Sequence, residues 1–450
     1  MPGQLTDLDV AAARAALDAR LNRDDDRPLA LALSGGGDSI ALLDLACEWA
    51  RGRGRRVLAL SVDHGLNPHS ADWSRRAEAA ARAAGADWRG LTWTGPRPAT
   101  GLSAAARMAR HRLLAQAARA AGARVILTGH TADDAAEADW MRARGTTIGR
   151  LRDWSPSPAW PEGRGLMLMR PLLAASRQGL RDHLRARGLD WIEDPANADP
   201  RFGRSRARRA LGDGDAIMDP ASALASPPGP APRPLGDGVF ALERDVDGRT
   251  LAMTLVCAGG GDRPPRGRRL EALKARLAAG EDFQATLAGA RLVAQGRQVL
   301  AHRDPGDYGR AGRPAAEADL IPGREMVWDG RLGVVTDQPG WRIGPAAGRR
   351  AGLSPADRAR LNAAPATARG AAPVLFRDGA DGPVLAGDAA QVVDWAARRL
   401  AMALDQTPHE ADLSFAPVGA KGRDRLSVSR TDTARPRLGG RTTEDENEPA

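Results

Sequence analysis

The first 210 residues alternate between short apolar runs and longer segments in which apolar residues recur at helical spacing. Apolar runs at 29–33, 56–62 and 124–128, with a shorter one at 88–93, have the length of buried strands. The helical spacing predicts helices at 8–21, 40–50, 70–84, 102–121 and 176–187. Strands that alternate with helices form a parallel sheet covered by helices on both faces. We therefore expect an α/β fold, a doubly wound parallel sheet, in a first domain at 1–212.

The pattern changes beyond residue 212. Six prolines between 220 and 234 predict a Pro-rich linker at 213–236. Apolar runs at 239–243 and 250–256, with shorter ones near 291–301 and 325–337, predict strands, and 269–279 predicts a helix. These elements indicate a second, smaller α+β domain at 237–405. Residues 420–450 are polar and charged with few large apolar groups, so we expect a disordered tail over 406–450.

Composition excludes several classes of protein. The 42% content of hydrophobic residues is enough for packed cores. The chain contains no run of 18 apolar residues and no signal-peptide core, so we expect a cytoplasmic protein without a membrane span. The only two cysteines, Cys47 and Cys257, lie far apart and in no metal-ligand spacing. This usage fits a reducing compartment and argues against zinc or an iron–sulfur cluster.

The net charge of +9 is unevenly placed along the chain. Residues 1–210 carry 33 arginines against 24 acidic residues, whereas the remainder carries 32 basic and 32 acidic residues. A basic first half indicates a polyanionic partner such as nucleic acid. Only two of the basic residues are lysines, so part of this arginine content can reflect the base composition of the gene.

The most informative stretch follows the first predicted strand, where Ser34-Gly-Gly-Gly-Asp-Ser39 leads into a helix. Glycines let backbone N–H groups approach an anion, and a helix N-terminus adds partial positive charge, so the stretch predicts a phosphate cradle. It is not a Walker A loop, because an acid stands where lysine is usual. It is not a dinucleotide turn either, because its glycines do not have the Gly-x-Gly-x-x-Gly spacing. Asp38 beside phosphates predicts a bound Mg²⁺ ion. An ordinary strand-to-helix turn is the simpler alternative.

Two more polar clusters follow strands, at Asp63–Gly65 and Gly129–Asp134. In parallel α/β sheets the ligands bind beyond the carboxyl ends of the strands, so all three clusters are expected to converge there. Asp63 and His64 either form a simple turn, in which the histidine is hydrogen-bonded within the protein, or contact the adenosine of a bound nucleotide.

The stretch after His130 holds two acids, Asp134 and Glu137, which share one face if the stretch is helical. They complement the helix dipole, or they form an anionic pocket for Mg²⁺ or for a substrate amine. On another predicted helix, Arg107 and Arg110 share a face that is either merely solvated or turned to a ligand.

Seven motifs occur in an order that resembles one enzyme family. The glycine loop resembles the pyrophosphate-binding loop of the PP-loop ATP pyrophosphatase superfamily. The ordered set over residues 28–210 resembles the tRNA(Ile)-lysidine synthetase family within it. The motifs are Ser-Gly-Gly-Gly-Asp-Ser at 34, Val-Asp-His-Gly-Leu at 62, Ala-Arg-x-x-Arg at 106, Gly-His-x-x-Asp-Asp-x-x-Glu at 129, Arg-Pro-Leu-Leu at 170, Leu-x-Trp-x-x-Asp-Pro-x-Asn at 189, and an Arg-rich run at 204.

The resemblance implies a two-step reaction with ATP and Mg²⁺ as cofactors. The wobble cytidine of tRNA(Ile) with a CAU anticodon is adenylated at its C2 oxygen, and free L-lysine then displaces AMP. The product, lysidine, changes codon recognition from AUG to AUA. The implied catalytic residues are Asp38, Arg110, Asp134 and Glu137, with Mg²⁺ at Asp38. ATP would contact Ser34, Gly35, Gly36, Gly37, Asp38, Ser39, Asp63, His64, Gly129 and His130, and tRNA would contact Arg107, Arg201, Arg204, Arg206 and Arg208.

Three alternatives remain open at this point. A tRNA-thiolating enzyme of the same superfamily shares the loop but generally needs paired or cluster-binding cysteines. An ammonia-using synthetase shares the loop but should lack a basic RNA surface. An RNA-binding protein with an inactive site would not need an intact Ser34–Ser39 loop and Glu137. The sequence gives no oligomeric state, and a homodimer is compatible with it.

Overall fold

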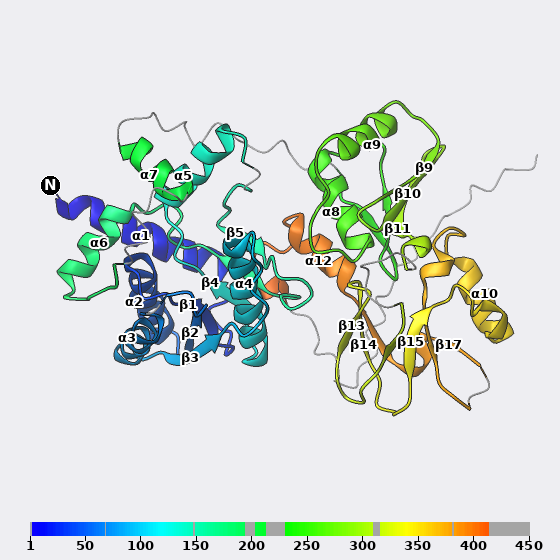
Figure 1. Ribbon diagram of the computed structural model, residues 1–450, viewed down its shortest axis with the longest axis horizontal. Helices are drawn as coiled ribbons and strands as arrows, with labels where there is room; N and C mark the ends of the chain where they lie inside the picture. Colours follow the sequence, from blue (N-terminus) through cyan, green and yellow to red (C-terminus); the bar gives the residue numbers. More distant parts are fainter. Residues whose placement is uncertain are drawn as a thin grey trace, which may run out of the picture.

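The apolar runs of the first 212 residues form one six-stranded sheet with the order β3-β2-β1-β4-β6-β5 (Figure 1). All neighbours pair in parallel except β5, which runs antiparallel to β6 at the edge. The computed structural model describes residues 2–67, 69–146, 149–193, 203–212, 230–308, 316–379 and 382–413. The strands are β1 (Leu29–Ala32), β2 (Val57–Asp63), β3 (Asp87–Thr92), β4 (Val125–Leu127), β5 (Trp154–Pro156) and β6 (Met167–Met169).

Helices cover both faces of this sheet, which confirms the predicted α/β class. Side chains alternate between the faces of a strand, so Leu29 and Leu31 enter one core and Ala30 and Ala32 enter the other. The first core lies under α1, α2 and α6, and the second lies under α4. The helices are α1 (Pro2–Arg20), α2 (Gly37–Arg51), α3 (Ser70–Ala83), α4 (Leu102–Ala120), α5 (Ala132–Ala143), α6 (Arg177–Ala186) and α7 (Gly203–Gly212).

The second part of the chain contains two packed units. The first is an antiparallel sheet, β7-β8-β11-β10-β9, with α8 and α9 against it. The second combines a four-stranded and a three-stranded sheet around a common core. Their elements are β7 (Arg233–Gly236), β8 (Val239–Leu242), α8 (Gly248–Ala258), α9 (Arg268–Ala278), β9 (Phe283–Leu287), β10 (Ala290–Gln295), β11 (Gln298–Arg303), η3 (Pro305–Asp307), β12 (Ala318–Asp319), β13 (Met326–Trp328), β14 (Leu332–Val335), β15 (Arg342–Pro345), η4 (Arg350–Gly352), α10 (Pro355–Ala363), η5 (Arg369–Ala371), β16 (Pro373–Phe376), β17 (Val384–Leu385), α11 (Ala386–Ala389), β18 (Gln391–Asp394), α12 (Trp395–Ala403) and η6 (Glu410–Leu413).

Two predictions of secondary structure are wrong. The run at 250–256 belongs to helix α8, because Asp247 caps its start by accepting hydrogen bonds from the N–H groups of Arg249 and Thr250. A short apolar run cannot by itself distinguish a strand from a buried helix. The apolar pattern also predicts no strand between residues 144 and 170, yet β5 and β6 lie there, because three-residue strands are too short for an alternation signal.

The expected boundaries also shift at two places. Strand β7 lies within the range 213–236 expected as a linker, and residues 213–229 lie outside the described residues. The expected tail at 406–450 begins with structure, since η6 packs against the first domain and Leu413 lies in its core. Residues 414–450 lie outside the described part of the chain.

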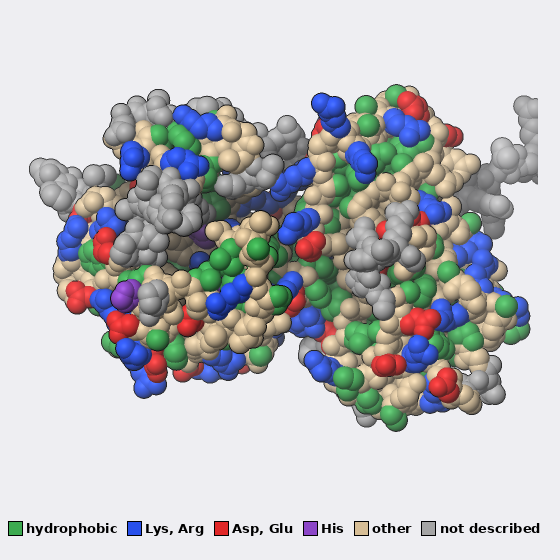
Figure 2. Space-filling model, in the orientation of Figure 1, with side chains coloured by type: hydrophobic (Ala, Val, Ile, Leu, Met, Phe, Trp, Pro, Cys, Tyr) green, Lys and Arg blue, Asp and Glu red, His purple; other side chains and the backbone are tan. Residues whose placement is uncertain are grey.

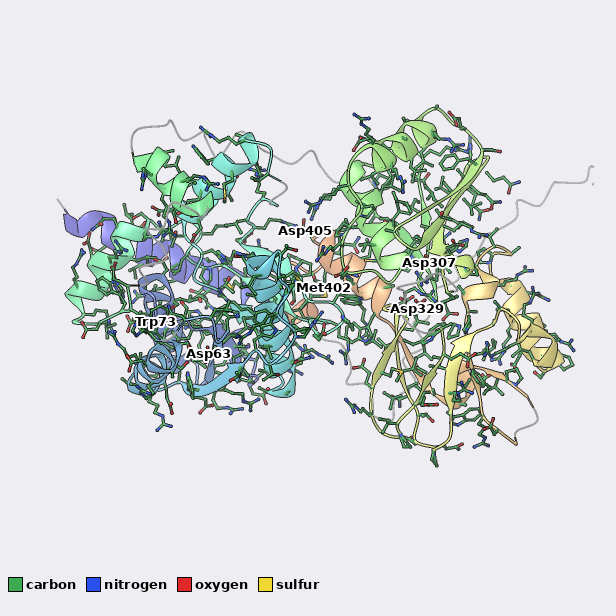
Figure 3. All side chains as sticks on the ribbon, in the orientation of Figure 1. Asp63, Trp73, Asp307, Asp329, Met402 and Asp405 are labelled. Carbon is green, nitrogen blue, oxygen red and sulfur yellow. The ribbon has the colours of Figure 1, made fainter. Side chains whose placement is uncertain are left out.

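The chain returns to the first domain through a buried ion pair between Arg55 and Glu410. Both side chains are fully buried, and the guanidinium donates to both carboxylate oxygens at 2.5 and 2.7 Å. The indole Nε1 of Trp154 donates to the carbonyl of Thr407 at 2.7 Å. Met402 and Asp405 lie where the two parts meet (Figure 3). The segment after α12 is therefore part of the first domain's structure.

A second set of contacts joins the two parts. Arg119 and Arg164 of the first domain both bind the carboxylate of Glu325, at 3.2 and 3.0 Å. The Nε1 of Trp160 donates to the carbonyl of Gly330 at 2.9 Å. Within the described ranges, no helix combines the length and apolar character that a membrane crossing requires.

We predict that Glu410→Gln destabilises the first domain by about 3–5 kcal/mol, because the mutation leaves a buried guanidinium without its counter-charge. The measurement is the urea midpoint followed by circular dichroism. Asp405→Asn is the matched control, since Asp405 pairs with Arg152 at the surface and its loss should cost at most about 1 kcal/mol. Equal losses in the two variants would contradict a structural role for the buried pair.

Candidate active site

The glycine loop joins β1 to α2 and is held in shape by its two serines. Ser39 Oγ donates to the carbonyl of Gly36 at 2.8 Å, and the hydroxyls of Ser34 and Ser39 lie 3.1 Å apart. Gly35 has a φ of +83°, a conformation that other residues rarely adopt. Helix α2 begins at Gly37 without a side-chain cap, so its first N–H groups have no side-chain acceptor there. This arrangement suits an anion.

Two other segments pack so closely against the loop that a side chain in place of either contacting glycine, Gly35 or Gly129, would collide with a neighbour. A Cβ atom on Gly35 would lie 2.5 Å from Cδ1 of Ile192, and the N–H of Ile192 donates to the Gly35 carbonyl at 2.9 Å. A Cβ on Gly129, after β4, would lie 2.9 Å from the carbonyl oxygen of Asp38. The clusters at Ser34–Ser39 and Gly129–Asp134 therefore meet at one edge of the sheet, as the strand order predicts.

The cluster after β2 forms a turn of its own. Asp63 Oδ1 accepts a hydrogen bond from the N–H of Gly65 at 2.7 Å. The His64 ring meets Trp93 edge-on at 6.2 Å, and among the described residues its buried Nδ1 has no hydrogen-bond partner. Burial, and then the charge of Arg110, lower the pKa of His64. A neutral ring with an unused nitrogen can bind a polar group of a nucleoside.

Helix α4 provides a basic wall on the same side of the sheet. Burial, followed by the charges of Arg107 and Arg110, lowers the pKa of His111 to about 3, so that this ring stays neutral. Arg107 also lowers the pKa of the buried Arg170, second to burial. The charge of Arg110 acts on His64, which follows β2, so this arginine lies near the end of that strand.

Helix α5 brings the predicted acids to this edge. Thr131 and Asp134 cap the helix reciprocally, since each backbone N–H donates to the other's side chain. Asp134 and Glu137 are 8% and 1% exposed, and both contact the guanidinium of Arg177, which also contacts Asp38 of the loop. Burial raises the pKa of Asp38, and the charge of Asp134 raises it further. This electrostatic coupling indicates that the acids of α2 and α5 share one site.

Two arginines occupy this acidic region. Arg177, the first residue of α6, lies 3.5 Å from Asp38, 3.4 Å from Asp134 and 3.2 Å from Glu137. Sequence reasoning missed it, and the only signal was its place shortly after the Arg170-Pro-Leu-Leu motif. Arg208 of α7 binds Glu137 with its Nε at 2.6 Å.

The other arginines predicted to contact tRNA lie on α7 or outside the described residues. Arg206 is exposed on α7. Arg201 and the side chain of Arg204 lie outside the described residues. Figure 2 shows basic side chains gathered over the upper side of both halves and at their junction.

The residues present fit a magnesium ion that is bound together with phosphates. No group of three metal-ligating side chains occurs in the part of the chain that the structure describes. Mg²⁺ usually keeps several waters and binds through one or two carboxylates plus substrate phosphates, so Asp38 beside the loop is sufficient.

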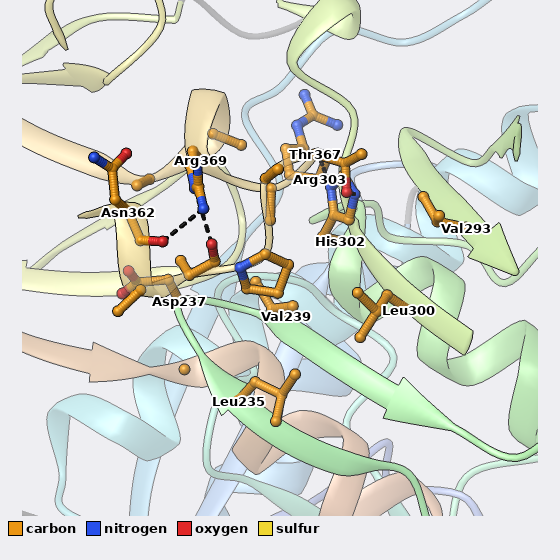
Figure 4. Close-up of a pocket in the computed structure, with 18 of the residues that line it drawn as sticks. Leu235, Asp237, Val239, Val293, Leu300, His302, Arg303, Asn362, Thr367 and Arg369 are labelled. Atoms are coloured by element: carbon orange, nitrogen blue, oxygen red, sulfur yellow. Dashed lines mark hydrogen bonds between the residues drawn. The ribbon is translucent and has the colours of Figure 1, made fainter. Parts of the chain in front are cut away.

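A cavity of about 750 Å³ in the second part is a weaker candidate (Figure 4). Polar side chains that line it already form hydrogen bonds within the protein. Arg369 donates to the carbonyls of Asn362 and Ala364, and His302 bonds Thr367. None of the predicted site residues lines it. The strand ends of the first domain are therefore the better candidate site.

The sheet order and the glycine loop define the class of this protein as a PP-loop ATP-binding protein. The family model described as "PP-loop domain" matches residues 10–214. The chain is 47% identical over 371 residues to the tRNA(Ile)-lysidine synthase of Caulobacter vibrioides, covering 82% of this chain and 89% of the relative. It is 37% identical over 343 residues to that of Hyphomonas neptunium, covering 70% and 92%.

The chain belongs to the tRNA(Ile)-lysidine synthase family. It is a ligase that uses ATP to form lysidine in tRNA(Ile). Among solved structures, the U34-tRNA thiolase NcsA of Methanococcus maripaludis matches with a TM-score of 0.39 and 17% identity, over 46% of this chain and 73% of that one. A similarity at that level carries no argument about activity.

We predict that Asp38→Ala lowers pyrophosphate release from ATP and tRNA at least about 100-fold at saturating Mg²⁺, because the phosphates lose their metal-binding carboxylate. Glu48→Ala is the control on the same helix, since Glu48 pairs with Arg14 at the surface.

The fold should survive the Asp38 substitution. Burial raises the pKa of this carboxyl above its unfolded value, so the folded protein holds the proton more tightly than the unfolded chain does. Ionisation of Asp38 therefore destabilises the folded state as pH rises above the unfolded pKa. The urea midpoint at neutral pH should therefore be unchanged or higher, and turnover like that of the wild type would exclude the metal role.

Proposed function

We propose that the two steps of lysidine formation use adjoining parts of this one site. The cytidine C2 oxygen attacks the α-phosphate of ATP, and pyrophosphate leaves. The amine of free L-lysine then attacks C2, AMP departs, and lysidine remains. We place the enzyme in the cytoplasm, where ATP, lysine and tRNA are available together.

The phosphate part of the site is the loop Ser34–Ser39 with Asp38. Backbone N–H groups of the loop and of the α2 N-terminus would bind the pyrophosphate oxygens. Mg²⁺ held by Asp38 would offset the phosphate charge. Gly129 lets the end of β4 approach, and His130 follows it on the same edge.

The base part of the site lies between β2 and α4. The pKa of His64 is lowered, and its Nδ1 has no hydrogen-bond partner within the described ranges, which suits contact with the nucleoside of ATP. Arg110 acts electrostatically on this histidine and would stabilise the negative charge that develops on the transferred phosphate.

The amine part of the site is the acidic group on α5, and one observation carries the proposal. Glu137 is 1% exposed, and among the described residues its Oε2 has no hydrogen-bond partner. A buried carboxylate oxygen without a donor is costly, so it indicates a donor that the ligand supplies. An ammonium group has three donors and a positive charge, which matches this need.

For tRNA we propose Arg107, Arg201, Arg204 and Arg206 as phosphate contacts. Arg208 was expected among them; because its Nε lies 2.6 Å from Glu137, we propose it for the amine pocket. Phosphate contacts fix the position of a nucleic acid without reading its sequence.

The cysteines favour ligation over thiolation. Cys47 lies in the core of the first domain and Cys257 in the core of the second part. Burial raises the pKa of each thiol to about 11, so neither is a reactive thiolate at neutral pH. Nucleoside analysis of the tRNA by mass spectrometry tests the whole proposal: lysidine should form only with ATP, lysine and a CAU anticodon, and pyrophosphate should appear without lysine.

We predict that Glu137→Gln raises the KM for lysine by about ten-fold or more, because a charge-assisted hydrogen bond contributes about 1.5–3 kcal/mol. Pyrophosphate release without lysine should persist. Asp139→Asn, on the same helix but paired with Arg142, is the control and should leave lysine dependence unchanged. Loss of adenylation with unaltered lysine dependence would assign the pocket to the metal or the cytidine.

We predict that Arg206→Ala with Arg209→Ala weakens tRNA binding and flattens its salt dependence, because both side chains are exposed on α7. Each lost phosphate contact should reduce the log–log slope by roughly one. Arg75→Ala with Arg82→Ala on α3 is the control, since these side chains form surface ion pairs with Asp72 and Glu78. A slope that stays at the wild-type value would show that α7 presents an ordinary solvated face.

A further inference from the structure

The proposed amine pocket already contains a cation, the guanidinium of Arg177. Its Nε lies 3.5 Å from Asp38, one terminal nitrogen lies 3.4 Å from Asp134 and 3.2 Å from Glu137, and the other lies 3.9 Å from Asp133. The backbone N–H of Arg177 also donates to Asp133 at 2.8 Å. The side chain is 16% exposed, so it is enclosed by these acids.

The contacts of this guanidinium are loose. Charge-assisted hydrogen bonds between guanidinium and carboxylate are usually about 2.7–2.9 Å long. None of the side-chain contacts of Arg177 is that short, whereas Arg208 binds Glu137 at 2.6 Å. Arg177 is therefore attracted by the whole acidic group and is not locked to any one member, so another donor can take its place.

The charges of the pocket are not balanced by its two arginines. Among the described residues, four carboxylates face the guanidinium groups of Arg177 and Arg208, with Arg181 acting on Asp38 from further away, which leaves an excess of negative charge when all are ionised. The unpartnered Oε2 of Glu137 lies in this region. An ammonium group that binds there meets attraction from the acids and repulsion from Arg177, because like charges a few ångströms apart repel strongly in a buried site.

We propose that Arg177 is the resident counter-ion of the amine pocket and competes with the substrate ammonium for Asp134 and Glu137. The inference rests on the proposed function of this pocket. Arg177 keeps the acids neutralised while the site is empty, and lysine binds by taking over part of its contacts. The affinity for lysine is then set by the difference between the free energies with which the acids bind the substrate ammonium and the Arg177 guanidinium.

The test is the KM for lysine in Arg177→Gln, measured by lysine incorporation at saturating ATP and tRNA. Removing a competing cation should lower this KM by about five-fold or more, the range typical of coupled binding. A residue that bound lysine, or that only held the helices together, would raise the KM when removed. Arg185→Gln is the matched control, because Arg185 lies on the same helix, is exposed and pairs with Asp182.

Arg177→Lys tests whether charge is the cause. Its ammonium keeps the charge but reaches fewer of the four acids, so the KM should lie between those of the wild type and of Arg177→Gln. A KM in folded Arg177→Gln that equals or exceeds the wild-type value overturns the inference. If the glutamine variant does not fold, the lysine variant decides, and a KM at or above wild type has the same meaning.

The outcome also separates this inference from the proposed function. If Glu137→Gln leaves the lysine dependence unchanged, the pocket does not bind the amine, and both proposals are wrong. If Glu137→Gln raises the KM while Arg177→Gln does not lower it, the amine pocket stands and only the role of Arg177 fails.

Discussion

The site depends on holding four carboxylates close together without unfolding the elements that carry them. Asp38 comes from the start of α2, and Asp133, Asp134 and Glu137 come from α5. Left alone, these charges would repel each other and raise each other's pKa, as Asp134 does for Asp38. Arg177 is the first residue of α6, and its guanidinium lies within 4 Å of all four. Three helix starts are thereby joined through one side chain, and an excess of negative charge remains for substrate cations.

Close backbone packing around the glycine loop is the second requirement. Gly35 and Gly129 stand where a Cβ atom would collide with Ile192 or with the backbone of Asp38. Segments far apart in sequence can therefore touch the loop. Ile192 bonds the carbonyl of Gly35, and Arg208 of α7 binds Glu137, so residues beyond α6 contact both the phosphate loop and the acidic group.

The second part of the chain is attached at two places, which limits how freely it can move. Glu325 binds Arg119 and Arg164, and Glu410 binds Arg55 in a fully buried pair. A buried ion pair is costly to break, because the partner left behind is desolvated and uncompensated. This attachment gives the two parts a defined relation to each other.

The sequence by itself determined the α/β class and the expectation that the polar clusters meet beyond the carboxyl ends of the strands, and it singled out Asp38, Asp134 and Glu137 as candidate site residues. These inferences rest on local signals, namely the spacing of apolar residues along the chain, glycines at a strand end, and acids three residues apart on a helix. Only the tertiary structure showed that Arg177 and Arg208 belong with the acids, that 250–256 is helical, and that Glu410 returns to Arg55 across 355 positions. A single arginine belongs to no periodic pattern or spaced motif, and an ion pair between residues far apart in the sequence leaves no local pattern either. The partners of such residues are therefore decided by tertiary packing alone.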